Sequence, residues 1–166
     1  MAYMSIDDPD FFARMPENMK HIQAGRSNGG NLVYFPMGDA KDNPPTVACL
    51  KIGPNGILGR HTHNCYRFEV IVRGTLDVGG RILKTGDVMV SEPHVFYGPH
   101  VAGPEGCTTF EIFSNYAGAH TPILETKDGP VEFDNSVPGT IDRMRALMAE
   151  QSAQALKPQG AAPAKA

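Results

Sequence analysis

The chain has no tryptophan, only three cysteines and little net charge. Its 166 residues carry a formal net charge of −3, so it has no basic field that would hold nucleic acid. No apolar run approaches the roughly 18 residues that a membrane span needs. Cys49, Cys65 and Cys107 cannot all pair, and the N-terminus lacks the basic-then-apolar pattern of a signal peptide. We therefore expect a cytoplasmic protein with reduced thiols and no nucleic-acid or membrane partner.

Turn-forming residues are plentiful, with 18 glycines and 14 prolines. This density favours many short strands joined by turns over a helical bundle. Residues 68–78 are rich in β-branched side chains and stop at Gly79-Gly80, a favoured hairpin turn. Further strands are expected at residues 32–35, 46–52, 81–83, 88–90 and, as the last, 107–113. The pattern predicts an all-β sandwich or barrel with at least six strands between residues 46 and 114.

The flanks of this β-rich core, residues 46–116, have a different character. Residues 1–45 predict an N-terminal arm with a short helix that starts after Asp8-Pro9 and ends before Pro16. Residues 117–156 form a C-terminal extension with one helix at 141–156, whose apolar face should dock on the barrel or on a second subunit. Residues 157–166 have nothing to bury and predict a disordered tail.

Two histidines stand two residues apart in His61-Thr62-His63. On a strand, such residues point to the same side, so both imidazoles should face one space. Two imidazoles that converge inside a barrel are half of a transition-metal site. The alternative is a pair of solvent-facing histidines on an edge strand. The histidines His21 and His120 lie outside this region, and we expect them at the surface.

The sequence around this pair resembles the two motifs of the cupin superfamily. The resemblance covers residues 46–114: the first motif corresponds to Gly56 through His61-Thr62-His63 to Gly74, and the second to Gly86-Asp87 through His100. It implies a small double-stranded β-helix, or jelly-roll, barrel, here with a short N-terminal arm and a C-terminal helix. Cupins are often metal-dependent, and single-domain members commonly pair, so the resemblance also implies a divalent metal and a homodimer.

The sequence departs from the cupin pattern at two ligand positions. Arg67 stands where the first motif has its metal-binding glutamate, and Tyr97 where the second has its histidine. An arginine cannot ligate a metal, and a tyrosine does so less often than a histidine. Glu69, His94 or His100 could complete the site instead. Simple alternation would point His100 outward, although Gly98-Pro99 can break that alternation.

The resemblance extends weakly to cupin dioxygenases that cleave small ketones with a three-histidine iron site. His61, His63 and His100 would supply that ligand set, with Fe(II) favoured over zinc, manganese or nickel. The alternative is a barrel that kept the cupin fold and lost the metal. Buried free thiols are expected at Cys49 and Cys107.

Arg67, Tyr97 and Glu69 are the candidate catalytic residues. A guanidinium at Arg67 could clamp a carboxylate or enolate, while Tyr97 could donate to a carbonyl. The competing interpretation pairs Arg67 with Glu69 or Glu111 and makes Tyr97 a packed aromatic.

The leading hypothesis is a metal-dependent cupin enzyme that acts on a small, oxygen-bearing and anionic organic molecule, with dioxygenase chemistry first. An isomerase or lyase, with or without metal, and a non-catalytic binding or sensor cupin are the alternatives.

Overall fold

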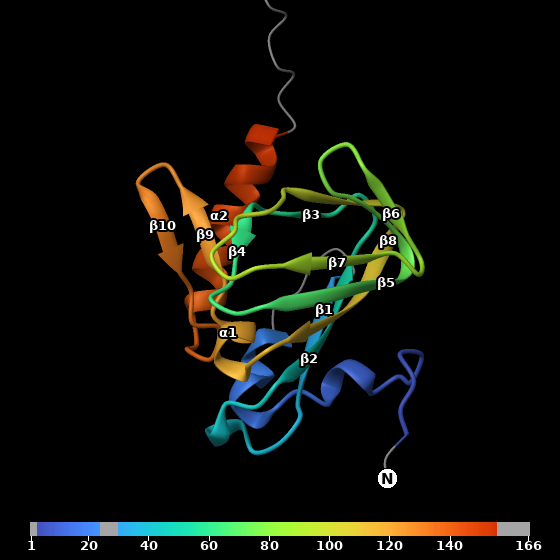
Figure 1. Ribbon diagram of the computed structural model, residues 1–166, viewed down its shortest axis with the longest axis vertical. Coiled ribbons are helices and arrows are strands. Elements are labelled where there is room, and N and C mark those ends of the chain that lie inside the picture. The colour runs from blue at the N-terminus through green and yellow to red at the C-terminus, as the bar shows by residue number, and fades with distance from the viewer. Residues whose placement is uncertain (1–2, 24–29, 156–166) are drawn as a thin grey trace, which may run out of the picture.

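The computed structural model describes residues 3–23 and 30–155, and the tail expected at 157–166 lies outside them. Strands dominate this part of the chain (Figure 1). They are β1 (Asn31–Pro36), β2 (Thr46–Ile52), β3 (Ile57–Leu58), β4 (His61–Thr62), β5 (Arg67–Asp77), β6 (Ile82–Lys84), β7 (Val88–Ser91), β8 (His100–Phe113), β9 (Ile123–Thr126) and β10 (Gly129–Glu132). The expected all-β class is confirmed, and β2 to β8 satisfy the minimum of six strands before residue 114.

Helices are few, and in the described residues they lie before β2 or after β8. The N-terminal arm contains two 3₁₀ helices, η1 (Phe11–Ala13) and η2 (Glu17–Gln23), and a third, η3 (Ala40–Asp42), precedes β2. The predicted N-terminal helix is therefore shorter than expected. The α-helices are α1 (Tyr116–His120) and α2 (Thr140–Ala155). In the described residues no helix is long and apolar enough to cross a membrane.

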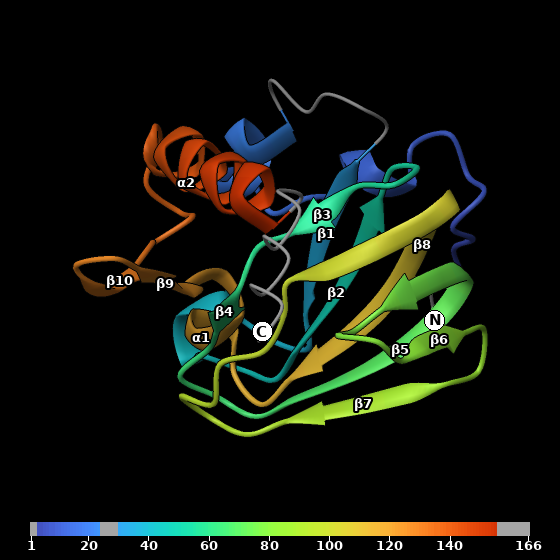
Figure 2. The same cartoon turned by 90° about the horizontal axis from the view of Figure 1, so that it is seen from above.

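The strands form two antiparallel sheets that curve around an interior. The larger sheet has the order β1-β2-β8-β5-β6, with β3 paired to β8 and β7 to β5. The smaller sheet has the order β10-β9-β4. Figure 2 shows β3 beside the start of β8, with which it pairs, and α2 next to β3. The hairpin predicted at Gly79-Gly80 is confirmed, since Asp77 of β5 faces Ile82 of β6 across it.

Two strand predictions need correction. Strand β8 starts at His100 rather than at residue 107, so residues 100–106 are part of a 14-residue strand. Its pairing with β5 shifts register twice on the way, and Gly106 adopts a positive φ of 84°. The glycines and the proline there therefore form irregularities within a strand rather than its end. Strand β8 is also not the last, because β9 and β10 follow it.

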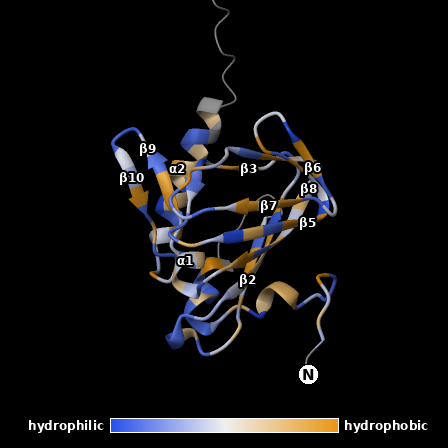
Figure 3. Cartoon of the chain, in the orientation of Figure 1, coloured by the Kyte–Doolittle hydropathy of each residue, from blue (hydrophilic) through white to orange (hydrophobic). Residues whose placement is uncertain are grey.

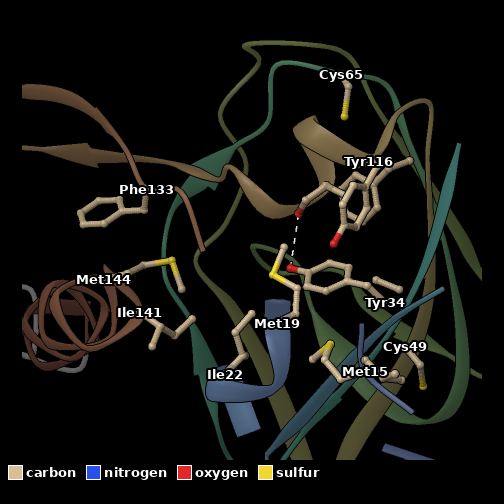
Figure 4. Close-up of a cluster of buried hydrophobic side chains, with 14 of the residues drawn as sticks. Met15, Met19, Ile22, Tyr34, Cys49, Cys65, Tyr116, Phe133, Ile141 and Met144 are labelled. Atoms are coloured by element: carbon tan, nitrogen blue, oxygen red, sulfur yellow. Dashed lines mark hydrogen bonds between the residues drawn. The ribbon is translucent and has the colours of Figure 1, made fainter. Parts of the chain in front are cut away.

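The main core joins the N-terminal arm to the barrel and to α2 (Figure 4). Met15, Met19 and Ile22 of the arm are buried against Ile141 and Met144 of α2 and the rest of this cluster. The apolar face of α2 is thus covered by other parts of the same chain. Of the two arrangements expected from the sequence, this is docking on the barrel rather than on a second subunit. All three cysteines are buried free thiols, as expected for Cys49 and Cys107.

Candidate functional site

His61 and His63 lie side by side inside the barrel, and both side chains are buried. Their ring centroids are 5.5 Å apart. Nδ1 of His61 lies 2.7 Å from the carbonyl oxygen of Gly59, and Nδ1 of His63 lies 2.7 Å from that of Gly118. A carbonyl oxygen only accepts hydrogen bonds, so each Nδ1 is the protonated nitrogen and donates. Each Nε2 then carries a free lone pair, and in the described part of the chain neither has a hydrogen-bond partner.

Both imidazoles are neutral near pH 7. Burial and, to a smaller extent, the nearby positive charge of Arg67 lower the pKa of His63 to about 3, although the hydrogen bond to Gly118 acts in the opposite direction. Burial, followed by the proximity of His63 and Arg67, holds the pKa of His61 well below 6.5. Neutral imidazoles with free Nε2 atoms can accept hydrogen bonds or coordinate a metal ion.

The pair opens onto a cavity of about 350 Å³ between the larger sheet and α2. Glu111 and Phe113 line it beside the histidines. Apolar side chains from both sides form most of the remaining wall, among them Leu32, Leu50, Leu58, Ile141, Met144 and Met148. The cavity is therefore mostly apolar. The polar side chains that line it are the two histidines and Glu111, together with Tyr34, Lys51, Asn135 and Arg145.

Tyr97 and His100 continue the line of rings that begins at His63. The centroid of the Tyr97 ring is 4.6 Å from that of His61, and the His100 ring stacks on Tyr97 at 5.6 Å. His61 and Tyr97 are held in register by two backbone hydrogen bonds, of 3.1 Å and 3.0 Å. His100 points inward and is buried, so simple alternation fails for it, as Gly98-Pro99 allowed. Burial lowers its pKa to about 4.

Arg67 is fully enclosed and bound to two carboxylates. Its guanidinium lies 2.9 Å from Glu69 and 2.9 Å from Glu111. Glu69 follows Arg67 by two residues on β5, and Glu111 faces Glu69 across the β5–β8 pairing. Burial, reinforced by the neighbouring Glu111 charge, raises the pKa of Glu69 to about 7. The structural interpretation of Arg67 is therefore found, with both partners at once. The two terminal guanidinium nitrogens that would clamp an anionic ligand are held by carboxylates.

A second cavity lies on the other side of the Tyr97 ring. It measures about 520 Å³ and is lined by Arg60, Arg67, Ser91, Tyr97 and His100 among others. The Arg67 guanidinium carbon sits 4.2 Å from the centre of the Tyr97 ring. Within the described residues, the Tyr97 hydroxyl, Nδ1 of His100 and Nε of Arg67 are buried without a hydrogen-bond partner. The predicted site residues thus face two cavities, with His61 and His63 on one and Tyr97 and His100 on the other.

The donors for the expected metal are only partly assembled. His61 and His63 are presented as metal-binding histidines usually are, with Nδ1 held by a carbonyl and Nε2 free. Among the described residues, however, no three His, Cys, Asp or Glu side chains form a group that could hold a metal ion. His100 lies beyond Tyr97, and the glutamate position holds Arg67, a paired cation. The described side chains therefore do not fit a complete metal site, which needs at least three protein ligands.

Several features of the site were missed in the sequence. The carbonyl anchors at Gly59 and Gly118 have no sequence signal, because Gly118 lies 55 residues from His63. His120 is buried and its Nδ1 lies 3.3 Å from Asp134, so the surface position expected for it is wrong. From the sequence, Glu111 was expected only as a possible partner of Arg67. Its inward position, however, follows from the alternation of side chains along the strand predicted at 107–113. His94 is exposed and remains outside the interior.

Solved structures share this architecture, although no family model and no curated protein matches the sequence. An RmlC-like cupin from Ralstonia eutropha is 16% identical, with a TM-score of 0.50 over 80% of this chain and 81% of its own. A second Ralstonia eutropha protein, of cupin-like fold and unknown function, is 16% identical with a TM-score of 0.48 over 72% of this chain and 75% of its own. An RmlC-like cupin from Shewanella frigidimarina is 20% identical with a TM-score of 0.45 over 54% of this chain and 79% of its own. With its two curved antiparallel sheets around a polar interior, the chain has the fold of the cupin superfamily.

Proposed function

We propose that the chain binds a small, largely apolar molecule with a hydroxyl or enol group in the cavity between the larger sheet and α2. The observation that carries this proposal is the pair of neutral imidazoles whose Nδ1 atoms donate to carbonyl oxygens, so that neither Nε2 has a hydrogen-bond partner among the described residues. A volume of about 350 Å³ is at the small end of ligand cavities, which span about 300–1,000 Å³.

The polarity of the cavity selects among ligands. The histidines and Glu111 at its inner end offer acceptors, so the polar end of a ligand should donate hydrogen bonds. Arg67 does not line this cavity, and two carboxylates hold its guanidinium. Lys51 and Arg145 do line it, but the Glu111 carboxylate beside the histidines would repel an anion bound to them. We therefore replace the anionic ligand expected from the sequence with a neutral one that carries a donor.

The depressed pKa values favour binding over proton transfer by the histidines. A general base works best when its pKa is close to the working pH, whereas the pKa of His63 is about 3. An isomerase or lyase that removes a proton with this imidazole would have a weak base. The binding cupin, one of the alternatives from the sequence, is thus the function that the interior supports best.

Metal-dependent oxygenase chemistry is the second candidate, and the same two Nε2 atoms favour it. A bound iron would supply a Lewis acid and a site for O₂, with His61 and His63 as two of its ligands. A third donor has to come from a rearranged His100 or from outside the described side chains. Metal analysis of protein purified without chelators tests this candidate: stoichiometric metal that is lost in His61→Ala, His63→Ala and His100→Ala would support it over binding alone.

The binding proposal is tested with three probes of similar size: phenol, toluene and benzoate. Their affinities are measured by calorimetry on the full chain in EDTA. We expect phenol to bind about fivefold more tightly than toluene, the value of one neutral hydrogen bond of about 1 kcal/mol, and benzoate to bind least.

Two substitutions test whether the probes bind at the histidines. His61→Phe and His63→Phe keep an aromatic ring and remove the acceptor, so phenol affinity should fall to that of toluene. His94→Asn removes an exposed ring and is the matched control. Tightest binding of benzoate, or a phenol affinity unchanged in both His→Phe variants, would contradict the proposal.

A further inference from the structure

The segment between β10 and α2 brings a polar side chain into the wall of the cavity between the larger sheet and α2. Asn135 is 2% exposed and lines this cavity beside Ala119 and Ile141. Its Oδ1 atom is buried and has no hydrogen-bond partner among the described residues. His61 and His63 line the same cavity. The wall therefore contains a second polar group, apart from the histidine pair, whose acceptor is not used within the described part of the chain.

Hydrogen bonds on both sides fix the backbone of Asn135. Its N–H donates to the carbonyl oxygen of His120 over 2.9 Å. Its own carbonyl oxygen lies 2.9 Å from Nε2 of His21, and this nitrogen donates, because a carbonyl oxygen only accepts. The flanking residues are joined as well, since the N–H and the hydroxyl of Ser136 both donate to Oδ1 of Asp134. The amide of Asn135 is thus presented by a hydrogen-bonded turn, which is how a preorganised contact for a ligand is built.

The short helix α1 holds both Asn135 and the histidine pair. The carbonyl oxygen of Gly118 accepts from His63, and that of His120, two residues further along, accepts from Asn135. Two residues are about 3 Å apart along the axis of an α-helix, so a single turn of α1 positions both groups. Figure 3 shows α1 next to the β9–β10 hairpin, and it shows hydrophobic as well as hydrophilic residues along α2. The two polar groups of the cavity wall therefore keep a fixed separation, with the apolar side of α2 beside them.

Other polar side chains of the wall have partners or contact solvent. The Tyr34 hydroxyl donates to a carbonyl oxygen of α1 over 3.4 Å (Figure 4). Arg145 donates to the carbonyl oxygen of Ile22 over 3.0 Å. Lys51 is exposed, so water can solvate its ammonium group. Asn135 differs from all three, because its acceptor is both buried and without a partner in the described residues.

An orphaned acceptor in a cavity wall indicates the chemistry of what fills the cavity. A buried amide without a partner has lost its hydrogen bonds to water and has gained none in exchange. Buried polar groups in folded proteins are nearly always paired, so the partner of Asn135 is expected to enter the cavity. The Oδ1 atom needs a donor, and the Nε2 atoms of His61 and His63 need another. A ligand with one polar end satisfies only one of these two sites.

We propose that Asn135 is the second polar anchor of the cavity, and that its ligand is a neutral molecule with two separate hydrogen-bond donors. One donor, a hydroxyl or enol, meets the histidine pair, and the other, a hydroxyl or primary amide, meets Oδ1 of Asn135. The body between them is apolar, because Leu50, Ile141 and Met148 are part of the wall. This inference rests on the proposed function, and it narrows the ligand from a molecule with one donor to a molecule with two.

The test compares ligands that differ only in the second donor. The three isomers of hydroxybenzyl alcohol carry a phenol hydroxyl and a hydroxymethyl group at different separations. The matching ethylphenols replace the second hydroxyl by a methyl group. Affinities are measured by calorimetry on the full chain in EDTA, for the wild type and for Asn135→Leu, which removes the amide and keeps a similar size. The quantity of interest is the preference for each alcohol over its ethylphenol.

We expect this preference, for the isomer in which it is largest, to fall about tenfold or more in Asn135→Leu, because the second hydroxyl is then buried without a partner. Asn64→Leu is the matched control, since Asn64 is exposed and is not among the residues that line the cavity. It should leave the preference unchanged. Asn135→Ala repeats the measurement in case leucine disturbs the turn, because alanine keeps both backbone hydrogen bonds. The circular dichroism of each variant should match that of the wild type.

The failure of this inference can be told apart from the failure of the proposed function. If the folded Asn135 variants keep the wild-type preference while His63→Phe still weakens binding of both compounds, the second anchor is wrong and the histidine site stands. The amide would then be satisfied by water. If neither the alcohols nor the ethylphenols bind the wild type, the proposed function is wrong and the inference falls with it. A loss of preference in Asn64→Leu as large as in Asn135→Leu would also overturn the inference.

Discussion

Acidification from about pH 7 to about pH 5 should destabilise the fold strongly, because three buried imidazoles are neutral in the folded protein. The pKa is about 3 for His63 and about 4 for His100, and it lies well below 6.5 for His61. In the unfolded chain each of them titrates near 6.5. A group whose pKa is lowered by folding binds its proton first in the unfolded state. Its contribution to stability is complete above about pH 6.5 and is lost as the pH falls toward the folded pKa.

The magnitude follows from the number of protons that separate the two states. Each imidazole lowers the unfolding free energy by about 1.4 kcal/mol per pH unit in this window, so three lower it by about 4 kcal/mol. Glu69 acts in the opposite direction, because folding raises its pKa from 4.5 to about 7. Its contribution to the unfolding free energy therefore falls as the pH rises and is recovered on acidification. The net loss is about 3 kcal/mol per pH unit below about pH 6, a large part of the 5–15 kcal/mol typical of a domain.

Urea unfolding followed by circular dichroism, in EDTA and at several pH values, measures this slope. His63→Phe removes one titrating ring and should reduce the slope by about 1.4 kcal/mol per pH unit. A stability that stays constant or rises on acidification would refute the assignment of neutral, buried histidines.

Two further substitutions examine the side chains that replace the usual cupin ligands. Arg67→Gln leaves Glu69 and Glu111 buried together without their cation, so the unfolding free energy should fall by about 3–5 kcal/mol in urea titrations. The double variant Arg67→Gln/Glu69→Gln should recover most of this lost free energy. If Arg67→Gln alone were as stable as the wild type, the ion pairs would not be needed for stability. Tyr97→Phe removes a buried hydroxyl without a partner among the described residues, so stability should stay equal or rise by about 1 kcal/mol; a loss of that size would show that the hydroxyl is hydrogen-bonded in solution.

The barrel could be predicted from the sequence because its signals are local. Gly79-Gly80 marks a hairpin, and the alternation around Arg67 and Glu69 places both side chains inward, as the structure has them. Strand β8 was cut short because residues 103–106, Gly-Pro-Glu-Gly, have the composition of a turn. The strand continues past them because it is paired before and after: residues 100–102 pair with β3 and β5, and residues 107–113 pair with β2 and β5.

The site could be predicted only as a set of residues, and not as an arrangement. The sequence indicates that His61 and His63 face one space. Their tautomers, however, depend on the carbonyl groups of Gly59, between β3 and β4, and of Gly118, in α1. The role of Arg67 depends on Glu111, which reaches it only through the register between β5 and β8. Tertiary pairing of this kind has no local signal, so the free clamp and the paired cation were equally consistent with the sequence.

The central claim is that His61 and His63 present unprotonated Nε2 atoms to the cavity. Long-range ¹H–¹⁵N NMR of the ring nitrogens in the full chain near neutral pH, in EDTA, reads the tautomer of each histidine directly. The account predicts a protonated Nδ1 and an unprotonated Nε2 for both residues, with the Nε2 resonances moving on addition of phenol. A protonated Nε2 on either ring, or an imidazolium at this pH, would contradict it.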